Sequence, residues 1–196
     1  KCHLSIAAKG KVIVMDYTNK AERYRLTREI AEEGIVLLKN KDSVLPIGSE
    51  KVAVFGRTQI NTIKCGTGSA FCLSEYQVNV LDGIRNAGIA VDEPLMEKYI
   101  AWEKENPIPA FGVWGSGSHI HPEMPITKDE VCEVALRGAE KAIVVLGRTA
   151  GENDDVVYME GDYMLSSEEK SLLEAVCHYF SKVIIVINSG NLIDLS

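Results

Sequence analysis

The chain has 196 residues, of which 46% are hydrophobic and 25% are charged, as in an ordinary globular protein with a full core. Its formal net charge is −7 and no cluster of lysines and arginines stands out, which argues against a nucleic-acid partner because binding phosphates needs a concentrated basic patch. The longest apolar runs, 143–146 and 183–187, are far shorter than the roughly 20 residues of a membrane helix.

The first part of the chain has two expected segments. Residues 1–18 are a leading segment or tether, in which residues 11–15 fit either a strand or a tether. Residues 19–196 are predicted to be one α/β domain. The domain opens with a helical pattern over residues 20–38, because Leu26, Ile30 and Leu38 fall on one face.

Three later runs are apolar continuously rather than alternately, at residues 51–55, 141–146 and 182–187. Such runs are typical of parallel strands that are covered on both faces. A weaker strand is expected near residues 89–91.

Helical patterns separate these strands, at residues 76–86 and 95–105 and after two capping-box sequences, Thr127 to Glu130 and Ser166 to Glu169. Strands that alternate with helices predict an α/β fold. We expect an open, doubly wound, mostly parallel sheet with helices on both faces.

Two of the predicted strands are followed by the same sequence, Gly-Arg-Thr, at residues 56–58 and 147–149. The first loop continues to Gly66-Thr-Gly-Ser69 and the second to Ala150-Gly-Glu152. Ligands of open parallel sheets bind beyond the carboxyl ends of the strands. A loop of small residues and an acidic loop are therefore expected on the same side of the sheet.

The loop at 66–69 does not match a nucleotide-binding motif. It lacks the Gly-Lys-Ser/Thr of a Walker loop and the third glycine of a dinucleotide fingerprint, and it lies about ten residues beyond its strand. By position alone, an exposed loop glutamate such as Glu152 is most often only solvated. No cofactor is predicted.

An irregular stretch at 106–125 interrupts the pattern, and long loops in compact domains are often functional. It contains His119 and His121, whose spacing would suit a metal ion. No third ligand is evident nearby, so no metal site is predicted and the role of the pair stays open.

The five cysteines are odd in number and form no C-x-x-C pair, which favours reduced thiols in an intracellular or anaerobic setting. Cys65 and Cys72 are close enough in sequence to pair, although nothing requires it. The chain begins at Lys1 and stops just after an apolar strand pattern, so we expect a piece of a longer polypeptide.

Three groups of residues, in this order and spacing, resemble glycoside hydrolase family 3 of the β-glucosidase type. They are residues 31–40 with 44–47, residues 51–56 with 66–69 and 81–84, and residues 144–152 with 161–165 and 186–191. The resemblance covers about residues 21–196, which correspond only to the α/β sandwich domain of that family.

The resemblance implies a retaining β-glycosidase whose sugar site lies between this domain and a (β/α)8 barrel that carries the nucleophilic aspartate. Ala150-Gly-Glu152 matches the start of the family motif S-G-E-G-x-D-R, which implies that Glu152 is the acid/base residue. The matching Thr67, Gly68 and Ser69 are implied to contact the sugar. The motif departs afterwards at Asn153 and Val156, which puts the supporting ion pair of the family in doubt.

Two segments, Gly147-Arg-Thr-Ala-Gly-Glu152 and the ending Asn188-x-Gly-Asn-x-Ile-Asp194, are similar to a subgroup from anaerobic bacteria in which the sandwich precedes the barrel. This similarity implies a fibronectin-like domain and a barrel in the same protein, a β-linked oligosaccharide or glycoside as substrate, and a bacterial cytoplasmic location. The isolated chain is expected to be inactive. The alternative is a non-catalytic carbohydrate-binding or scaffolding module. Trp102, Phe111 and Trp114 fit either an aromatic platform for the aglycone or packing, and packing is favoured for Trp102.

Overall fold

The computed structural model describes residues 3–8, 11–16, 19–75, 77–108, 121–152 and 155–196. They form two compact units, Lys1–Ser43 and Val44–Ser196. In the first unit, β1 (His3–Ala8) and β2 (Lys11–Asp16) form an antiparallel hairpin, and α1 (Lys20–Gly34) follows. Residues 11–15 are therefore in a strand. The predicted domain of residues 19–196 stays a prediction.

Helix α1 is shorter than predicted. Asn19 caps its first turn by accepting a hydrogen bond from the Glu22 N–H at 3.2 Å, as expected because asparagine is one of the favoured N-cap residues. The helix ends at Gly34, a residue that weakens helices, and the backbone of Ile35 is already extended. The prediction of helix over residues 35–38 was wrong, and these four apolar side chains are exposed.

The second unit, which begins at Val44, contains a parallel sheet in the order β3 (Val52–Phe55), β4 (Lys141–Arg148) and β5 (Val183–Ser189). Val52 lies opposite Lys141, and Ala142 lies opposite Val183. The three predicted strands are confirmed to within two residues at each end. The weaker strand expected near residues 89–91 is reduced to one bridge between Val91 and Val52.

In the described ranges between these strands, the chain forms the α-helices α2 (Val80–Asn86), α3 (Glu93–Glu105), α4 (Lys128–Leu136) and α5 (Ser167–Tyr179). Both predicted capping boxes form, each with reciprocal hydrogen bonds between the cap and the third helical residue. Helix α2 begins later than predicted because Asn79 caps it, and α3 begins earlier because Asp92 caps it.

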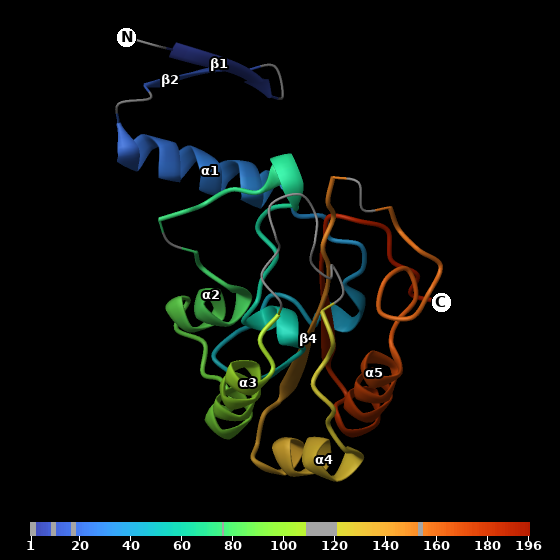
Figure 1. The fold of residues 1–196 in the computed structure, drawn as a ribbon. Helices are drawn as coiled ribbons and strands as arrows, with labels where there is room; N and C mark the ends of the chain where they lie inside the picture. The colour runs from blue at the N-terminus through green and yellow to red at the C-terminus, as the bar shows by residue number, and fades with distance from the viewer. Residues whose placement is uncertain (1–2, 9–10, 17–18, 76, 109–120, 153–154) are drawn as a thin grey trace. The chain divides into compact units, whose positions relative to one another are not determined.

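Successive side chains of a strand point to opposite sides, and those of β3 and β4 are all buried, so both faces of these strands are covered. β5, the outer strand in the order β3-β4-β5, is half-buried, with Ile185 exposed. Figure 1 shows α2 and α5 on opposite sides of β4. One face packs mainly against α3, α4 and α5 through Phe55, Val144, Leu146, Tyr99, Val131, Leu172 and Val176. The other packs against α2 and α3 through Val54, Ile143, Val145, Leu81 and Met96. This layering confirms the predicted α/β sandwich. No helix in the described ranges is long and apolar enough to cross a bilayer.

Candidate functional site

The loop after β3 is fixed to the neighbouring strand from its first residue. Gly56 has a φ of +95°, and a Cβ there would lie 2.1 Å from the carbonyl oxygen of Val145. Only glycine fits this close approach. The next turn, η2 (Arg57–Gln59), is buried, and the Thr58 hydroxyl donates to the same Val145 oxygen at 2.7 Å. The loop therefore leaves the sheet in a defined direction.

The loops after β3 and β4 meet beyond the carboxyl ends of their strands, as predicted. The N–H of Thr67 donates to the carbonyl oxygen of Ala150 at 3.0 Å, and Thr67 forms a bridge with Gly151. Gly66 packs so closely here that a Cβ would lie 2.8 Å from the same Ala150 oxygen. These backbone contacts join the two candidate motifs.

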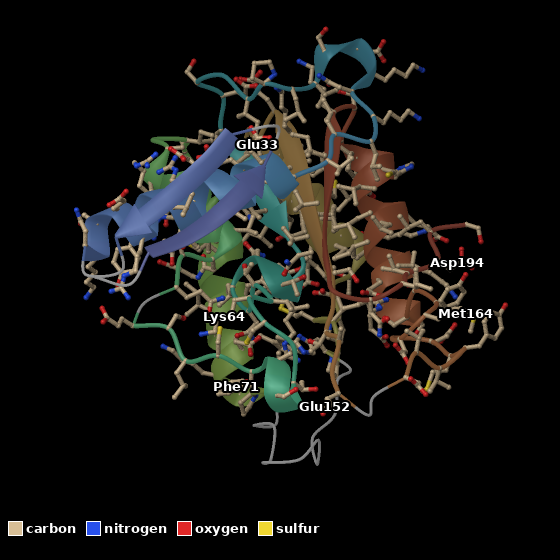
Figure 2. All side chains as sticks on the ribbon, turned by 90° about the horizontal axis from the view of Figure 1, so that it is seen from above. Glu33, Lys64, Phe71, Glu152, Met164 and Asp194 are labelled. Atoms are coloured by element: carbon tan, nitrogen blue, oxygen red, sulfur yellow. The ribbon has the colours of Figure 1, made fainter. Side chains whose placement is uncertain are left out.

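Glu152 is held directly by the loop of small residues. The N–H of Ser69, in η3 (Gly68–Ala70), donates to Oε2 of Glu152 at 2.9 Å. Gly68 has a φ of +63°, and a Cβ there would lie 2.8 Å from the Cβ of Glu152. In Figure 2, Glu152 lies at the same end of the molecule as Phe71, which follows this loop. The structure thus brings Thr67, Gly68, Ser69 and Glu152 together.

The carboxylate of Glu152 is exposed, and its pKa is lowered from the ordinary value. The cause is hydrogen bonding by the Ser69 side chain, followed by the Ser69 N–H, because both donors favour the charged form. A general acid needs a raised pKa. The hydrogen bonds from Ser69 therefore stabilise the charged form of Glu152. For Glu152 to act as an acid, a further surface must cover its carboxyl group and exclude water from it.

A hollow of about 220 Å³ lies beside this contact and is lined by the first loop together with Thr149 and His121. Ligand pockets usually enclose about 300–1,000 Å³. The hollow is therefore smaller than a usual pocket for a drug-sized ligand.

His121 lies within hydrogen-bonding distance of the second loop, with Nε2 2.9 Å from the hydroxyl oxygen of Thr149. His119, Phe111 and Trp114 lie outside the described residues. Trp102 packs against the core, with the Arg57 guanidinium 4.8 Å from its ring centroid, which agrees with the packing role favoured for it. Among the residues that the structure describes, no group of three or more acidic, histidine or cysteine side chains is placed to hold a metal ion.

The arginines of the two Gly-Arg-Thr sequences anchor both loops, a role that the sequence reasoning missed. Arg57 bonds Glu103 at 2.9 Å and the carbonyl oxygen of Pro122 at 3.0 Å. Arg148 donates to both carboxylate oxygens of Glu169, each at 2.7 Å, and the two side chains are almost fully buried. The repeated tripeptide was the available signal, since a buried arginine requires acceptors.

Glu123 is a second buried residue that the sequence did not reveal. Its carboxylate accepts hydrogen bonds from the backbone N–H groups of Arg57 at 2.8 Å and Met124 at 2.9 Å. Burial raises the pKa of this carboxyl to about 7, against the opposing effect of these hydrogen bonds. The Tyr99 hydroxyl, which accepts from the Gly56 N–H at 2.9 Å, also bonds it. Glu123 thus links the stretch after His121 to the loop after β3.

The raised pKa of Glu123 predicts that the protein loses stability as pH rises from about 5 to about 7. The folded state binds a proton across this range that the unfolded chain, with a pKa near 4.5, has released. The stabilisation by this proton is fully present below the pKa of the unfolded chain and is lost above the folded-state pKa of about 7. It amounts to at most about 3 kcal/mol. Urea unfolding at pH 5 and pH 7, with the parent and the Glu123→Gln variant, measures it. An unchanged pH slope in the variant would contradict the assignment.

The fold and the paired loops define the class of this chain, an α/β sandwich domain with a candidate carboxylate site at the carboxyl edge of its sheet. Residues 35–196 match the model of the glycosyl hydrolase family 3 C-terminal domain. The chain belongs to this family, as the resemblance of its motifs predicted.

Relatives and solved structures agree with the assignment. The chain is 35% identical over 186 residues to a β-glucosidase of Ruminococcus albus, a match that covers 94% of this chain and 19% of the relative. A β-glucosidase structure from Paenibacillus barengoltzii superposes with a TM-score of 0.82 at 41% identity, over 87% of this chain and 19% of that one. β-Glucosidase 3B of Thermotoga neapolitana, solved with glucose, has a TM-score of 0.79 at 30% identity, over 89% of this chain and 25% of that one.

The chain therefore spans about a fifth to a quarter of the length of these relatives. It corresponds to one domain of larger β-glucosidases.

Proposed function

We propose that the chain is part of a retaining β-glycosidase, similar to β-glucosidases, that hydrolyses terminal β-linked sugars, and that Glu152 is its acid/base residue. The observation that carries the proposal is the hydrogen bond from the Ser69 N–H to Glu152 Oε2, which joins the two loops singled out by the family motifs. The family of the chain and the names of its relatives support the reaction class.

Retaining hydrolysis needs two carboxyl groups about 5 Å apart. In the proposed reaction a carboxylate of the accompanying (β/α)8 barrel attacks the anomeric carbon while Glu152 protonates the leaving oxygen. Glu152, now a carboxylate, then takes a proton from the water that releases the sugar. The pKa of Glu152 is low in the described chain, so the barrel must raise it by excluding water and by placing the negative nucleophile nearby.

Thr67, Gly68 and Ser69 are proposed to face the sugar. The Ser69 N–H donates to Glu152 Oε2, so these residues lie beside the carboxylate that is proposed to reach the leaving oxygen of the sugar. The proposed partners are the barrel and a fibronectin-like domain of the same protein, and the proposed location is the bacterial cytoplasm.

A non-catalytic carbohydrate-binding module is the second candidate. The exposure and the lowered pKa of Glu152 favour it, because a permanently charged carboxylate accepts hydrogen bonds from sugar hydroxyls without transferring a proton.

The test compares the isolated chain with the intact protein that contains it, on a panel of aryl β-glycosides. We expect hydrolysis by the intact protein, with a β-configured first product in a proton NMR time course, and no turnover by the isolated chain. An α-configured first product would refute the retaining mechanism. Turnover by the isolated chain would show that no barrel is needed. Binding of glucosides without hydrolysis by the intact protein would favour the binding module.

A further inference from the structure

Two cysteines flank the loop that holds Glu152. Cys65 precedes Gly66 and Cys72 follows Phe71, and both are free thiols, the first half-buried and the second exposed. The Sγ of Cys65 lies 3.9 Å from the carbonyl oxygen of Cys72, so the two ends of the loop are in contact. Figure 2 labels the chain neighbours Lys64 and Phe71 of these cysteines.

The two thiols also influence each other. The pKa of the Cys72 thiol is raised, first by its hydrogen bond with Cys65 and then by the negative charge of an ionised Cys65. The raised pKa suits Cys72 to the role of the second thiol, which attacks only after the first has reacted. Reactive thiols are those that are accessible and able to ionise, and a neighbouring thiol completes the oxidation.

We propose that Cys65 and Cys72 are a redox-active dithiol, and that their disulfide locks the loop of residues 66–71. The oxidant is a small-molecule disulfide. The Cys65 thiolate attacks one of its sulfur atoms, forms a mixed disulfide and releases one thiolate. Cys72 then loses its proton and attacks the Cys65 sulfur, which releases the second small thiol. The two protein thiols lose two electrons in total, and the small disulfide is reduced to two thiols.

The locked loop is the one whose N–H groups bind the Glu152 loop. Thr67 donates to Ala150 and Ser69 donates to Glu152, so opening the loop breaks both hydrogen bonds. A cross-link between the ends of a short segment removes open conformations from its ensemble. The inference concerns the loop and does not require that Glu152 be catalytic.

The first test treats the intact protein with oxidised glutathione, alkylates the remaining thiols and maps the peptides by mass spectrometry. We expect a disulfide between Cys65 and Cys72 without retained glutathione, which dithiothreitol reverses. Cys177, an exposed thiol on α5, is the internal control and should carry a glutathione adduct. The Cys72→Ser variant should hold glutathione on Cys65. Separate adducts on Cys65 and Cys72 of the parent, or two unmodified thiols, would overturn the proposal.

The second test measures amide hydrogen exchange of the oxidised and reduced protein. Peptides that cover residues 66–71 should exchange at least several-fold more slowly after oxidation, and those from α5 should not change. The Cys72→Ser variant should exchange alike under both conditions. Equal exchange of residues 66–71 in a parent whose disulfide has been mapped would refute the locking of the loop. Neither readout depends on glycoside turnover, so a failure here is distinct from a failure of the proposed hydrolase.

Discussion

Replacing Glu152 by glutamine in the intact protein is expected to lower the turnover of a β-glycoside with a poor leaving group by about 10²–10⁴-fold, the usual contribution of general acid–base catalysis. The amide oxygen of the new glutamine side chain can still accept from the Ser69 N–H, so the loop contact at 2.9 Å survives while the transferable proton is lost. Steady-state kinetics should therefore show a fall in kcat and a retained affinity for the sugar.

Two controls separate the chemistry from damage to the loop. Glu174→Gln removes an exposed carboxylate on α5 and should leave turnover within a factor of about two, because nothing in the proposal uses that side chain. With Glu152→Ala, added azide should restore turnover of substrates with good leaving groups, since a small anion can attack the glycosyl-enzyme without a general base. If Glu152→Gln turned over like the parent, the acid/base would lie elsewhere and the domain would have a binding or scaffolding role.

The strands were predictable because they form continuous apolar runs. Burial on both faces requires such a run at residues 141–146, and residues 182–187 have the same pattern although β5 is only half-buried. The helices with capping boxes were equally readable, since Thr127 and Ser166 start them by local hydrogen bonds. The end of α1 was missed because the apolar spacing continues to Leu38, while the conformation changes after Gly34.

The site was predictable only in part. Parallel topology places the loops after β3 and β4 at one edge, so the neighbourhood of Ser69 and Glu152 followed from the strand pattern. The buried contacts that hold these loops did not follow from it. Glu123 bonds the N–H of Arg57 across 66 positions of sequence, and no local pattern encodes such a contact. A buried carboxyl held by backbone N–H groups has no signature of its own in a single sequence.

Replacing Arg148 by methionine is expected to lower the free energy of unfolding by about 3–5 kcal/mol, because removal of one partner leaves a buried charge without compensation. Arg148 and Glu169 are only 4% and 6% exposed, and Arg148 also donates to the carbonyl oxygens of Asp162 and Met164. The matched control is Lys170→Met, next to Glu169 on α5. Lys170 forms an exposed ion pair with Glu160, and the loss of this pair should leave the urea midpoint unchanged.

The double variant, Arg148→Met with Glu169→Leu, tests whether the loss comes from the stranded carboxylate. Buried ion pairs replaced as a unit by apolar side chains are often nearly neutral, so the double variant should recover most of the stability. Urea unfolding of both variants gives the coupling between the two positions. A single variant as stable as the parent would show that the pair is not buried in solution. Glu169→Leu also removes the acceptor of the Ser166 N–H in the capping box of α5. A double variant no better than the single one would therefore assign the loss to that cap together with the carbonyl oxygens of Asp162 and Met164, which Arg148 holds.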